Sequence, residues 1–133
     1  MQGLKLKDLE RSEHGDYLSF DLKEIFSAIG DPVLISTWRC RNVECTGENA
    51  ERMHEVSEEG QSLSGEQLVE IVAGIFQTFD GEFEAYRDGK ETPWLVVNAV
   101  DSAWFEVLSV DSAVLESIWS SFHDVSELPP TAA

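Results

Sequence analysis

The sequence has few positive charges. It contains 9 Lys and Arg against 26 Asp and Glu, and none of the basic residues follows Lys90. The formal net charge is -17 over 133 residues. A chain this acidic repels nucleic acid and anionic membranes, and it attracts cationic partners. We therefore expect a basic protein partner, with no direct binding to nucleic acid or to a membrane.

Long apolar runs are also missing. The longest apolar stretches, at 71–76 and 94–97, fall far short of the about 20 residues that span a bilayer. Residues 1–16 are polar and contain no apolar segment typical of a secretory signal. These features predict a cytoplasmic protein.

Cysteine is scarce, with only Cys40 and Cys45 in the chain. On one predicted strand their odd separation places the two side chains on opposite faces, which disfavours a disulfide. The C-x4-C spacing has no companion pair of ligands, as a structural metal site would need. We expect two reduced thiols with Cys40 buried, and neither a metal nor a cofactor.

Specific catalytic motifs are absent as well. The chain has no Gly-x-Ser-x-Gly elbow and no glycine-rich phosphate-binding loop. One Glu-x-x-His step, Glu51 to His54, is too little for a di-iron site, which needs two such steps and further carboxylates. Carboxylates are too numerous for any pair to be diagnostic of acid/base catalysis. We therefore expect a binding protein rather than an enzyme.

The composition is nevertheless that of a folded protein. Hydrophobic residues make up 42% of the chain, including 4 Trp and 7 Phe, which is too rich for a disordered acidic tail. The length fits one domain with a substantial core. We expect a single domain over residues 1–133, with an N-terminal segment and a C-terminal tail that fray.

Hydrophobic periodicity predicts three helices. Asp21 and Glu24 resemble a capping arrangement before a short helix that ends at Gly30 and Pro32. A second helix is expected over 64–79, closed by Asp80 and Gly81. A third follows a cap at Asp111.

Period-two alternation predicts four strands. The first starts at Val33, with Leu34, Trp38 and Cys40 on one face and Thr37, Arg39 and Arg41 on the other. Three more, at 82–87, 94–100 and 103–109, form a meander. Only one helical crossover separates the first strand from the others. The order favours an α+β fold, a mainly antiparallel sheet of about four strands with helices packed on one face.

Glu48, Glu51, Glu55 and Glu58 recur at steps of three or four residues, so they line one face if residues 48–59 are helical, with Glu59 beside them. Like charges at these spacings each cost a few tenths of a kcal/mol, which a cationic partner would explain. A solvated face, or a general adaptation to high salt, is the alternative explanation. Trp94, directly after Pro93, could be an exposed aromatic anchor, although a lone aromatic is more often packed in the core. The partner-binding residues that we predict are Glu44, Glu48, Glu51, Glu55, Glu58, Glu59 and Trp94.

The leading hypothesis is a non-enzymatic module that presents a carboxylate face to a basic protein, in sharper form an inhibitor, immunity protein or DNA mimic. One alternative is a small-molecule-binding or enzymatic domain with Arg39 and Arg41 as an anion anchor, unless these pair with glutamates on neighbouring strands. The other is an assembly or scaffolding subunit with an exposed aromatic surface around Trp94.

Overall fold

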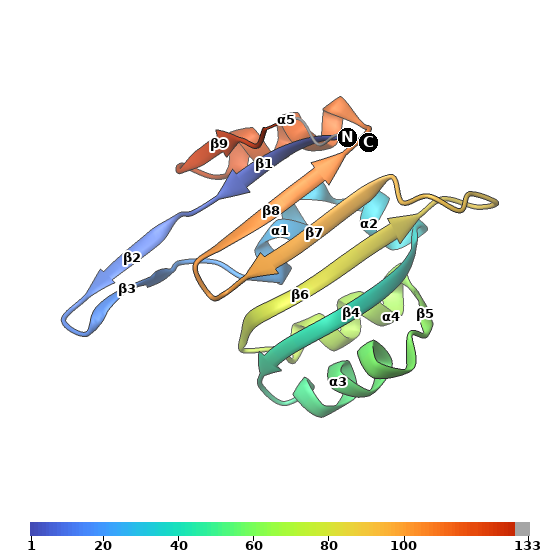
Figure 1. The fold of residues 1–133 in the computed structure, drawn as a ribbon, viewed down its shortest axis with the longest axis horizontal. Helices are drawn as coiled ribbons and strands as arrows, with labels where there is room; N and C mark the ends of the chain where they lie inside the picture. The colour runs from blue at the N-terminus through green and yellow to red at the C-terminus, as the bar shows by residue number, and fades with distance from the viewer. Residues whose placement is uncertain (130–133) are drawn as a thin grey trace.

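The computed structural model describes residues 1–129, and its centre is one antiparallel sheet (Figure 1). Its strands are β1 (Gln2–Leu6), β4 (Thr37–Thr46), β5 (Ser62–Ser64), β6 (Gln77–Tyr86), β7 (Leu95–Val100), β8 (Trp104–Ser109) and β9 (Val125–Glu127). The seven strands are ordered β5-β4-β6-β7-β8-β1-β9. The α+β class and the antiparallel sheet are confirmed, whereas the prediction of about four strands was too low.

The N-terminal segment, which we expected to fray, is a strand inside the sheet. β1 pairs with β8 on one side and with β9 on the other, and it buries Leu4 and Leu6. Its partners lie about a hundred residues further along the chain, so no local pattern indicates the pairing. A two-stranded hairpin of β2 (Leu9–Ser12) and β3 (Gly15–Leu18) then projects from the body (Figure 1). The predicted C-terminal tail lies mostly outside the described residues.

The helices lie behind the sheet and beside β4 in Figure 1. Those behind it are α1 (Leu22–Ile29), α2 (Asp31–Ile35), α4 (Gly65–Ala73) and α5 (Ser112–Ser121), and the one beside β4 is α3 (Ala50–Glu59). Among the described residues, no helix is long and apolar enough to cross a membrane. Within residues 1–129, the face of the sheet turned toward the viewer carries no helix (Figure 1). We call it the open face.

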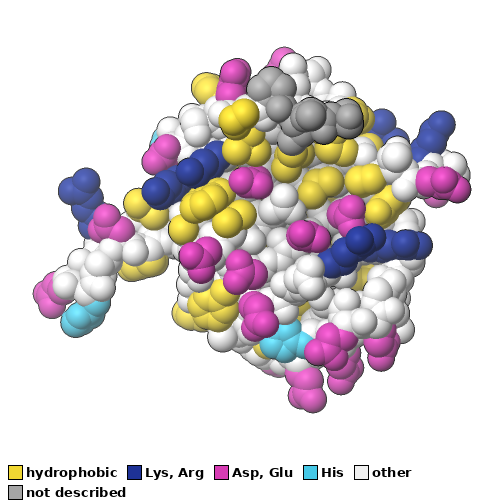
Figure 2. Space-filling view, viewed as in Figure 1, with side chains coloured by type: hydrophobic (Ala, Val, Ile, Leu, Met, Phe, Trp, Pro, Cys, Tyr) yellow, Lys and Arg dark blue, Asp and Glu magenta, His cyan; other side chains and the backbone are white. Residues whose placement is uncertain are grey.

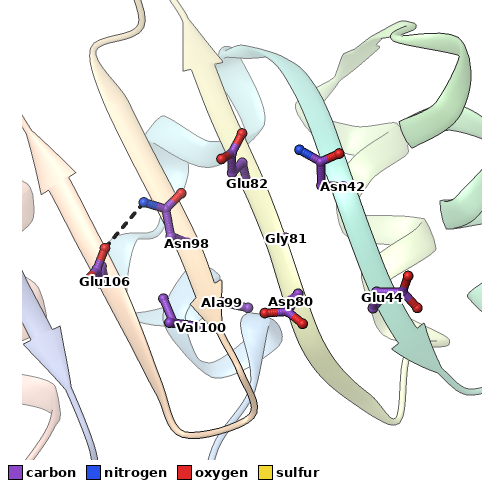
Figure 3. A pocket seen from close by; sticks show the side chains of 9 residues that line it. All are labelled: Asn42, Glu44, Asp80, Gly81, Glu82, Asn98, Ala99, Val100 and Glu106. Atoms are coloured by element: carbon purple, nitrogen blue, oxygen red, sulfur yellow. Dashed lines mark hydrogen bonds between the residues drawn. The ribbon is translucent and has the colours of Figure 1, made fainter.

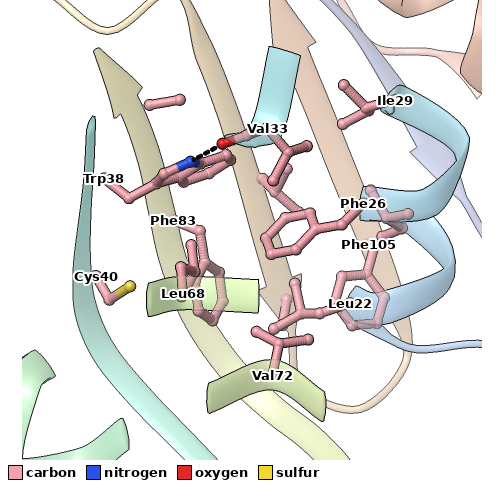
Figure 4. Close-up of a cluster of buried hydrophobic side chains, with 14 of the residues drawn as sticks. Leu22, Phe26, Ile29, Val33, Trp38, Cys40, Leu68, Val72, Phe83 and Phe105 are labelled. Carbon is pink, nitrogen blue, oxygen red and sulfur yellow. Dashed lines mark hydrogen bonds between the residues drawn. The ribbon is translucent and has the colours of Figure 1, made fainter. Parts of the chain in front are cut away.

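The core fills the space between the covered face of the sheet and the helices (Figure 4). Trp38, Phe83 and Phe105 from three strands are fully buried. The Trp38 ring lies 5.1 Å from the ring of Phe26 on α1, and its indole N–H donates to the Val33 carbonyl at 2.9 Å. Because a buried indole N–H without an acceptor would be costly, this bond fixes the tryptophan against α2.

The first predicted helix is confirmed and the first predicted strand begins later than expected. At α1, the Asp21 N–H donates to Glu24 Oε1 at 3.2 Å, as the capping arrangement predicts. Residues 33–35 form the end of α2, not a strand, because Pro32 near the start of that helix supplies a helical φ. Leu34 is therefore 44% exposed and does not share a strand face with Trp38.

The helix expected over 64–79 is also shorter than predicted. The cap of Ser64 and Gln67 is present, but α4 ends at Gly74. The Phe76 N–H donates to the Thr46 carbonyl at 2.7 Å, so the chain already pairs with β4 there, and Phe76 is 81% exposed. Asp80 and Gly81 lie within β6 rather than closing a helix.

Strand β4 contains an irregularity that changes which side chains face the core. Asn42 has a φ of 53°, and the register with β6 shifts between Arg41 and Glu44. This bulge returns Cys45 to the buried face that also holds Cys40. The expectation that the two cysteines face opposite sides was wrong, although Cys40 is buried as predicted. Both are free thiols.

Candidate functional site

The predicted acidic segment is helical, and its carboxylates point outward. Helix α3 packs on β4 through Met53 and Val56, which are buried. All the glutamates predicted for this face are exposed, and Figure 2 shows Asp and Glu side chains gathered over this part of the molecule. We call them the α3 carboxylates: Glu51, Glu55, Glu58 and Glu59 on the helix itself, with Glu48 in the turn before it and Glu44 on β4 beside it.

The α3 carboxylates have little compensation from basic groups. Arg52 is the basic residue within α3, and its Nη1 lies 3.4 Å from Glu70 Oε1 on α4. Both partners of this ion pair are largely exposed, so its contribution to stability is small. The ion pair is more important for where it places the charge, because it holds the Arg52 guanidinium beside α4. No ion pair to an α3 carboxylate occurs within the described residues.

A small hollow connects α3 to the bulge in β4. The Val43 N–H donates to Ser57 Oγ at 3.2 Å, which ties the bulge to the helix. The hollow is lined by Asn42, Val43, Glu44, His54, Ser57 and Glu58.

At the inner side of the same helix, His54 Nε2 lies 3.9 Å from Cys45 Sγ. Burial, assisted by the carboxylates of Asp21 and Glu44, raises the pKa of the Cys45 thiol to about 11. A thiol with this pKa is neither a ready nucleophile nor a ready metal ligand. Within residues 1–129, no group of three or more His, Cys, Asp or Glu side chains is placed to hold a metal ion.

A second hollow opens on the uncovered face of the sheet, and sequence reasoning did not predict it (Figure 3). Its volume is about 470 Å³. We call it the sheet hollow, and its polar lining consists of Asn42, Glu44, Asp80, Glu82, Asn98 and Glu106. Asn42 and Glu44 line both hollows, so the sheet hollow continues the acidic surface of α3.

Three residues of the sheet hollow form a row across adjacent strands. Glu82 of β6 lies opposite Asn98 of β7, which lies opposite Glu106 of β8. Glu106 accepts from Asn98 Nδ2 at 3.5 Å and from Trp104 Nε1 at 3.1 Å. The Asn98 Oδ1 atom is buried and has no donor. The alternation of β6 and β8 indicates that Glu82 and Glu106 share a face, but only the register shows that Asn98 lies between them.

The predicted arginine pair is divided between two environments. Arg41 Nε lies 3.1 Å from Glu84 Oε1, which is the cross-strand pairing that the sequence offered as an alternative to anion binding. The Arg39 guanidinium lies 5.8 Å from the centre of the Tyr86 ring. Arg39 lines a hollow of about 350 Å³ together with Arg87 and Lys90 rather than with Arg41.

Trp94 is not an exposed anchor. Its side chain is 5% exposed, its indole N–H donates to Ser36 Oγ at 3.0 Å, and the Arg87 guanidinium covers its ring at 4.3 Å. Pro93 ends the preceding turn, but the Trp94 N–H still bonds to the Ala85 carbonyl, so the residue enters the sheet. No protein-family model, curated protein or solved structure matches this chain.

Proposed function

We propose that the protein is a non-enzymatic binding module that presents the α3 carboxylates to a basic protein partner, and that the encounter is cytoplasmic. The observation that supports this most directly is the alignment of Glu51, Glu55, Glu58 and Glu59 along α3, where no ion pair within the described residues compensates them. Their repulsion lowers the stability of α3, and a cationic surface would relieve it. If these carboxylates served only to keep the protein soluble, they would not need to align along one helix.

Electrostatic complementarity explains how such a surface would work. A cluster of carboxylates raises the rate of encounter with a cationic protein and rejects anionic competitors. Both effects weaken as salt is added, because salt screens the charges. The screening length is about 8 Å at physiological ionic strength. We therefore expect an association that is fast at low salt and strongly dependent on salt.

A sharper form of the proposal is an inhibitor, immunity protein or DNA mimic that occupies the nucleic-acid site of its partner. Duplex DNA carries one negative charge per about 1.7 Å of its axis. Steps of three or four residues along a helix separate carboxylates by about 4.5–6 Å, which is a lower density than DNA offers. The carboxylates of the sheet hollow widen the array sideways, so a mimic would use both surfaces together.

The test is affinity capture from a lysate of the cells that make the protein, followed by mass spectrometry. The baits are the natural protein, a variant with Glu51→Lys, Glu55→Lys and Glu58→Lys, and a control with Glu13→Lys, Glu116→Lys and Glu127→Lys. The two variants change the net charge equally, and all six positions are exposed. We expect a basic protein to be retained by the natural protein and by the control, and to be lost from the α3 variant.

Two outcomes would contradict the proposal. Equal loss from both variants would show that the net charge, not α3, attracts the partner. Retention of no basic protein at low salt would remove the basis of the proposal altogether. Release of the partner at high salt is expected if the contact is mainly electrostatic.

A second candidate function is binding of a small anion, and the hollow around Arg39 favours it. Arg39, Arg87 and Lys90 bring three positive charges to this hollow, beside the Thr37 and Ser62 hydroxyl groups. Guanidinium groups and hydroxyls are common ligands of carboxylates and phosphates. The carboxylates of Asp88 and Glu91 line the same hollow and oppose an anion there. A rise in melting temperature with phosphate or citrate, abolished by Arg39→Gln, would support this function.

An assembly or scaffolding role was the third hypothesis, and it depended on an exposed Trp94. The burial of this side chain removes that basis. Among the described residues, the large apolar side chains that are most exposed lie elsewhere, at Ile35, Phe76, Val110 and Trp119.

A further inference from the structure

We propose that the sheet hollow receives an arginine side chain of the basic partner, with the guanidinium held between Glu82 and Glu106 and above Asn98. This inference rests on the proposed function, because it assigns a recognised group to the partner. It concerns the open face of the sheet, which no helix covers (Figure 1).

The row of three residues supplies acceptors at regular intervals. Glu82, Asn98 and Glu106 lie directly opposite one another on neighbouring strands, and their side chains stand on the open face (Figure 3). Side chains opposite each other in an antiparallel pair have Cβ atoms about 5 Å apart. The Cβ atoms of Glu82 and Glu106 are therefore about 10 Å apart, on the two sides of Asn98. Their long side chains would have to reach inward to a guanidinium above Asn98.

The basic residues at the two ends of this row contact other groups. The register continues the row to Arg41 beside Glu82 and to Lys5 beside Glu106. Arg41 pairs with Glu84, and the Lys5 ammonium lies 4.2 Å from the centre of the Trp104 ring. Within the described chain neither Glu82 nor Glu106 has an ion pair. Basic residues therefore lie opposite Glu82 and Glu106, yet they form their contacts with other groups. The two carboxylates of the row are paired with no cation within the described residues.

Asn98 gives an observation that does not depend on charge. Its Oδ1 atom is buried and accepts no hydrogen bond, whereas its Nδ2 already donates to Glu106. A buried acceptor without a donor is unfavourable, and native structures contain few of them. An N–H group arriving from outside the chain would satisfy this atom at the position where the two carboxylates favour a positive charge.

The geometry suits a guanidinium better than a metal ion or an ammonium group. The carboxylates stand on separate strands, and within residues 1–129 none of them belongs to a cluster that could hold a metal ion. Arginine offers five N–H donors in one plane, which can serve several acceptors at once, whereas lysine offers a single point of charge. Val100 lines the same hollow, so the methylene groups of an arginine would also find an apolar contact.

Continuity with α3 explains how one partner would use both surfaces. Asn42 and Glu44 line the hollow beside α3 and the sheet hollow alike. A basic segment seated on the α3 carboxylates therefore has an acidic path onto the open face.

The test uses the ¹⁵N-labelled protein and two probes, the peptide acetyl-Gly-Arg-Gly-Arg-Gly-amide and its lysine counterpart. The signals to follow are the Trp104 indole N–H, which donates to Glu106, and the Asn98 side-chain amide. The variant Trp104→Phe assigns the indole signal. We expect both signals to move with one dissociation constant, and the arginine peptide to bind about fivefold tighter than the lysine peptide.

Two matched variants separate this site from general attraction. Glu82→Gln with Glu106→Gln removes two charges from the row and keeps the shape of both side chains. Glu116→Gln with Glu127→Gln removes two charges from exposed positions elsewhere. The first pair should weaken the arginine peptide about tenfold, and the second should leave the shifts at Trp104 and Asn98 in place.

The failure of this inference is distinguishable from the failure of the proposed function. Binding with shifts confined to α3, unchanged by Glu82→Gln with Glu106→Gln, would overturn the arginine site and leave the α3 proposal standing. Equal binding of the two peptides would show that only charge is recognised. If no signal moved with either peptide, the arginine site would be excluded, and the capture experiment would still decide the function of α3.

Discussion

Cys40 and Cys45 lie on the same buried face of β4, although an odd number of positions separates them. The irregularity at Asn42 causes this, because Arg41 and Asn42 are both exposed and the alternation of β4 starts again at Val43. The partner strand makes a matching change between Asp80 and Thr78, so Arg41 and Cys45 keep the same register with β6. The same irregularity displaces Glu44 and Asn42 to the open side, where they join the two hollows. One irregular residue therefore positions both the core and the acidic surface.

The bulge predicts different effects for two substitutions at Asn42. Its φ of 53° is in the left-handed region, which glycine and asparagine tolerate and β-branched residues do not. Asn42→Val should lower the free energy of unfolding by about 1–2 kcal/mol, and Asn42→Gly should change it by less than about 0.5 kcal/mol. Urea denaturation measures both. Equal midpoints for the two variants would contradict the bulge.

Both thiols should be unreactive in the folded protein. Burial raises the pKa of Cys40 to about 12, and burial with two nearby carboxylates raises that of Cys45 to about 11. At pH 8 only about one part in a thousand of such a thiol is ionised, so alkylation requires unfolding. We expect iodoacetamide to label the native protein on the order of a hundred times more slowly than the urea-denatured protein. Rapid labelling of one cysteine under native conditions would show that its burial is incomplete.

Local patterns predicted the parts of the fold that local interactions determine. The cap at Asp111 and the alternation of β7, β8 and the second half of β6 were visible in the sequence. The pairing of β1 with β8 and β9 was not, because it joins distant segments. The bulge at Asn42 was missed for a related reason, since asparagine in a strand gives no sign of its φ.

The same distinction applies to the candidate site: features within one segment were predicted, and features that depend on the pairing of several segments were not. Helical spacing alone was enough to place Glu51, Glu55, Glu58 and Glu59 on one exposed face, since a single helix determines it. Glu44 and Glu48 lie outside that helix, on β4 and in the turn before α3. The row of Glu82, Asn98 and Glu106 depends on the register of three strands, which no single segment reveals. Trp94 was misjudged because the acceptor of its indole N–H, Ser36, lies on a distant segment.

The burial of Trp94 predicts a large difference between two tryptophans. Trp94 is 5% exposed and Trp119 is 51% exposed. Trp94→Ala should lower the free energy of unfolding by about 3–5 kcal/mol, through the cavity and the loss of the platform beneath Arg87. Trp119→Ala should cost less than about 1 kcal/mol. Similar losses for the two variants, measured in urea, would be inconsistent with this placement of Trp94.

Asp21 should make the stability depend on pH. Its carboxylate accepts from Thr78 N at 3.0 Å and from Thr78 Oγ1 at 2.8 Å, yet burial outweighs these bonds and raises its pKa above the usual value. The folded state therefore binds the proton more tightly than the unfolded state does. The stability contributed by this group is fully present below its ordinary pKa of 3.8 and is lost as the pH rises through the raised value.

The variant Asp21→Asn, which cannot ionise, isolates this effect. Relative to the variant, the natural protein should gain stability as the pH falls from 7 toward the ordinary pKa of 3.8. The measurement is the free energy of unfolding of both proteins across this range. A difference that stays constant with pH, or that changes in the opposite direction, would show that the hydrogen bonds from Thr78 outweigh burial.

The C-terminal end of α3 should show a conflict between stability and binding. Glu58 and Glu59 lie where the helix dipole is negative, and the last turn contains no basic residue. Glu58→Gln with Glu59→Gln should raise the free energy of unfolding by about 1 kcal/mol at low salt, and by less at high salt. The same variant should bind the basic partner more weakly, because both side chains belong to the proposed contact. Glu116→Gln on α5 serves as the control, since it removes an exposed charge away from a helix end. If the α3 variant lost stability instead, its carboxylates would have a structural role, and the argument that a partner must relieve their repulsion would fail.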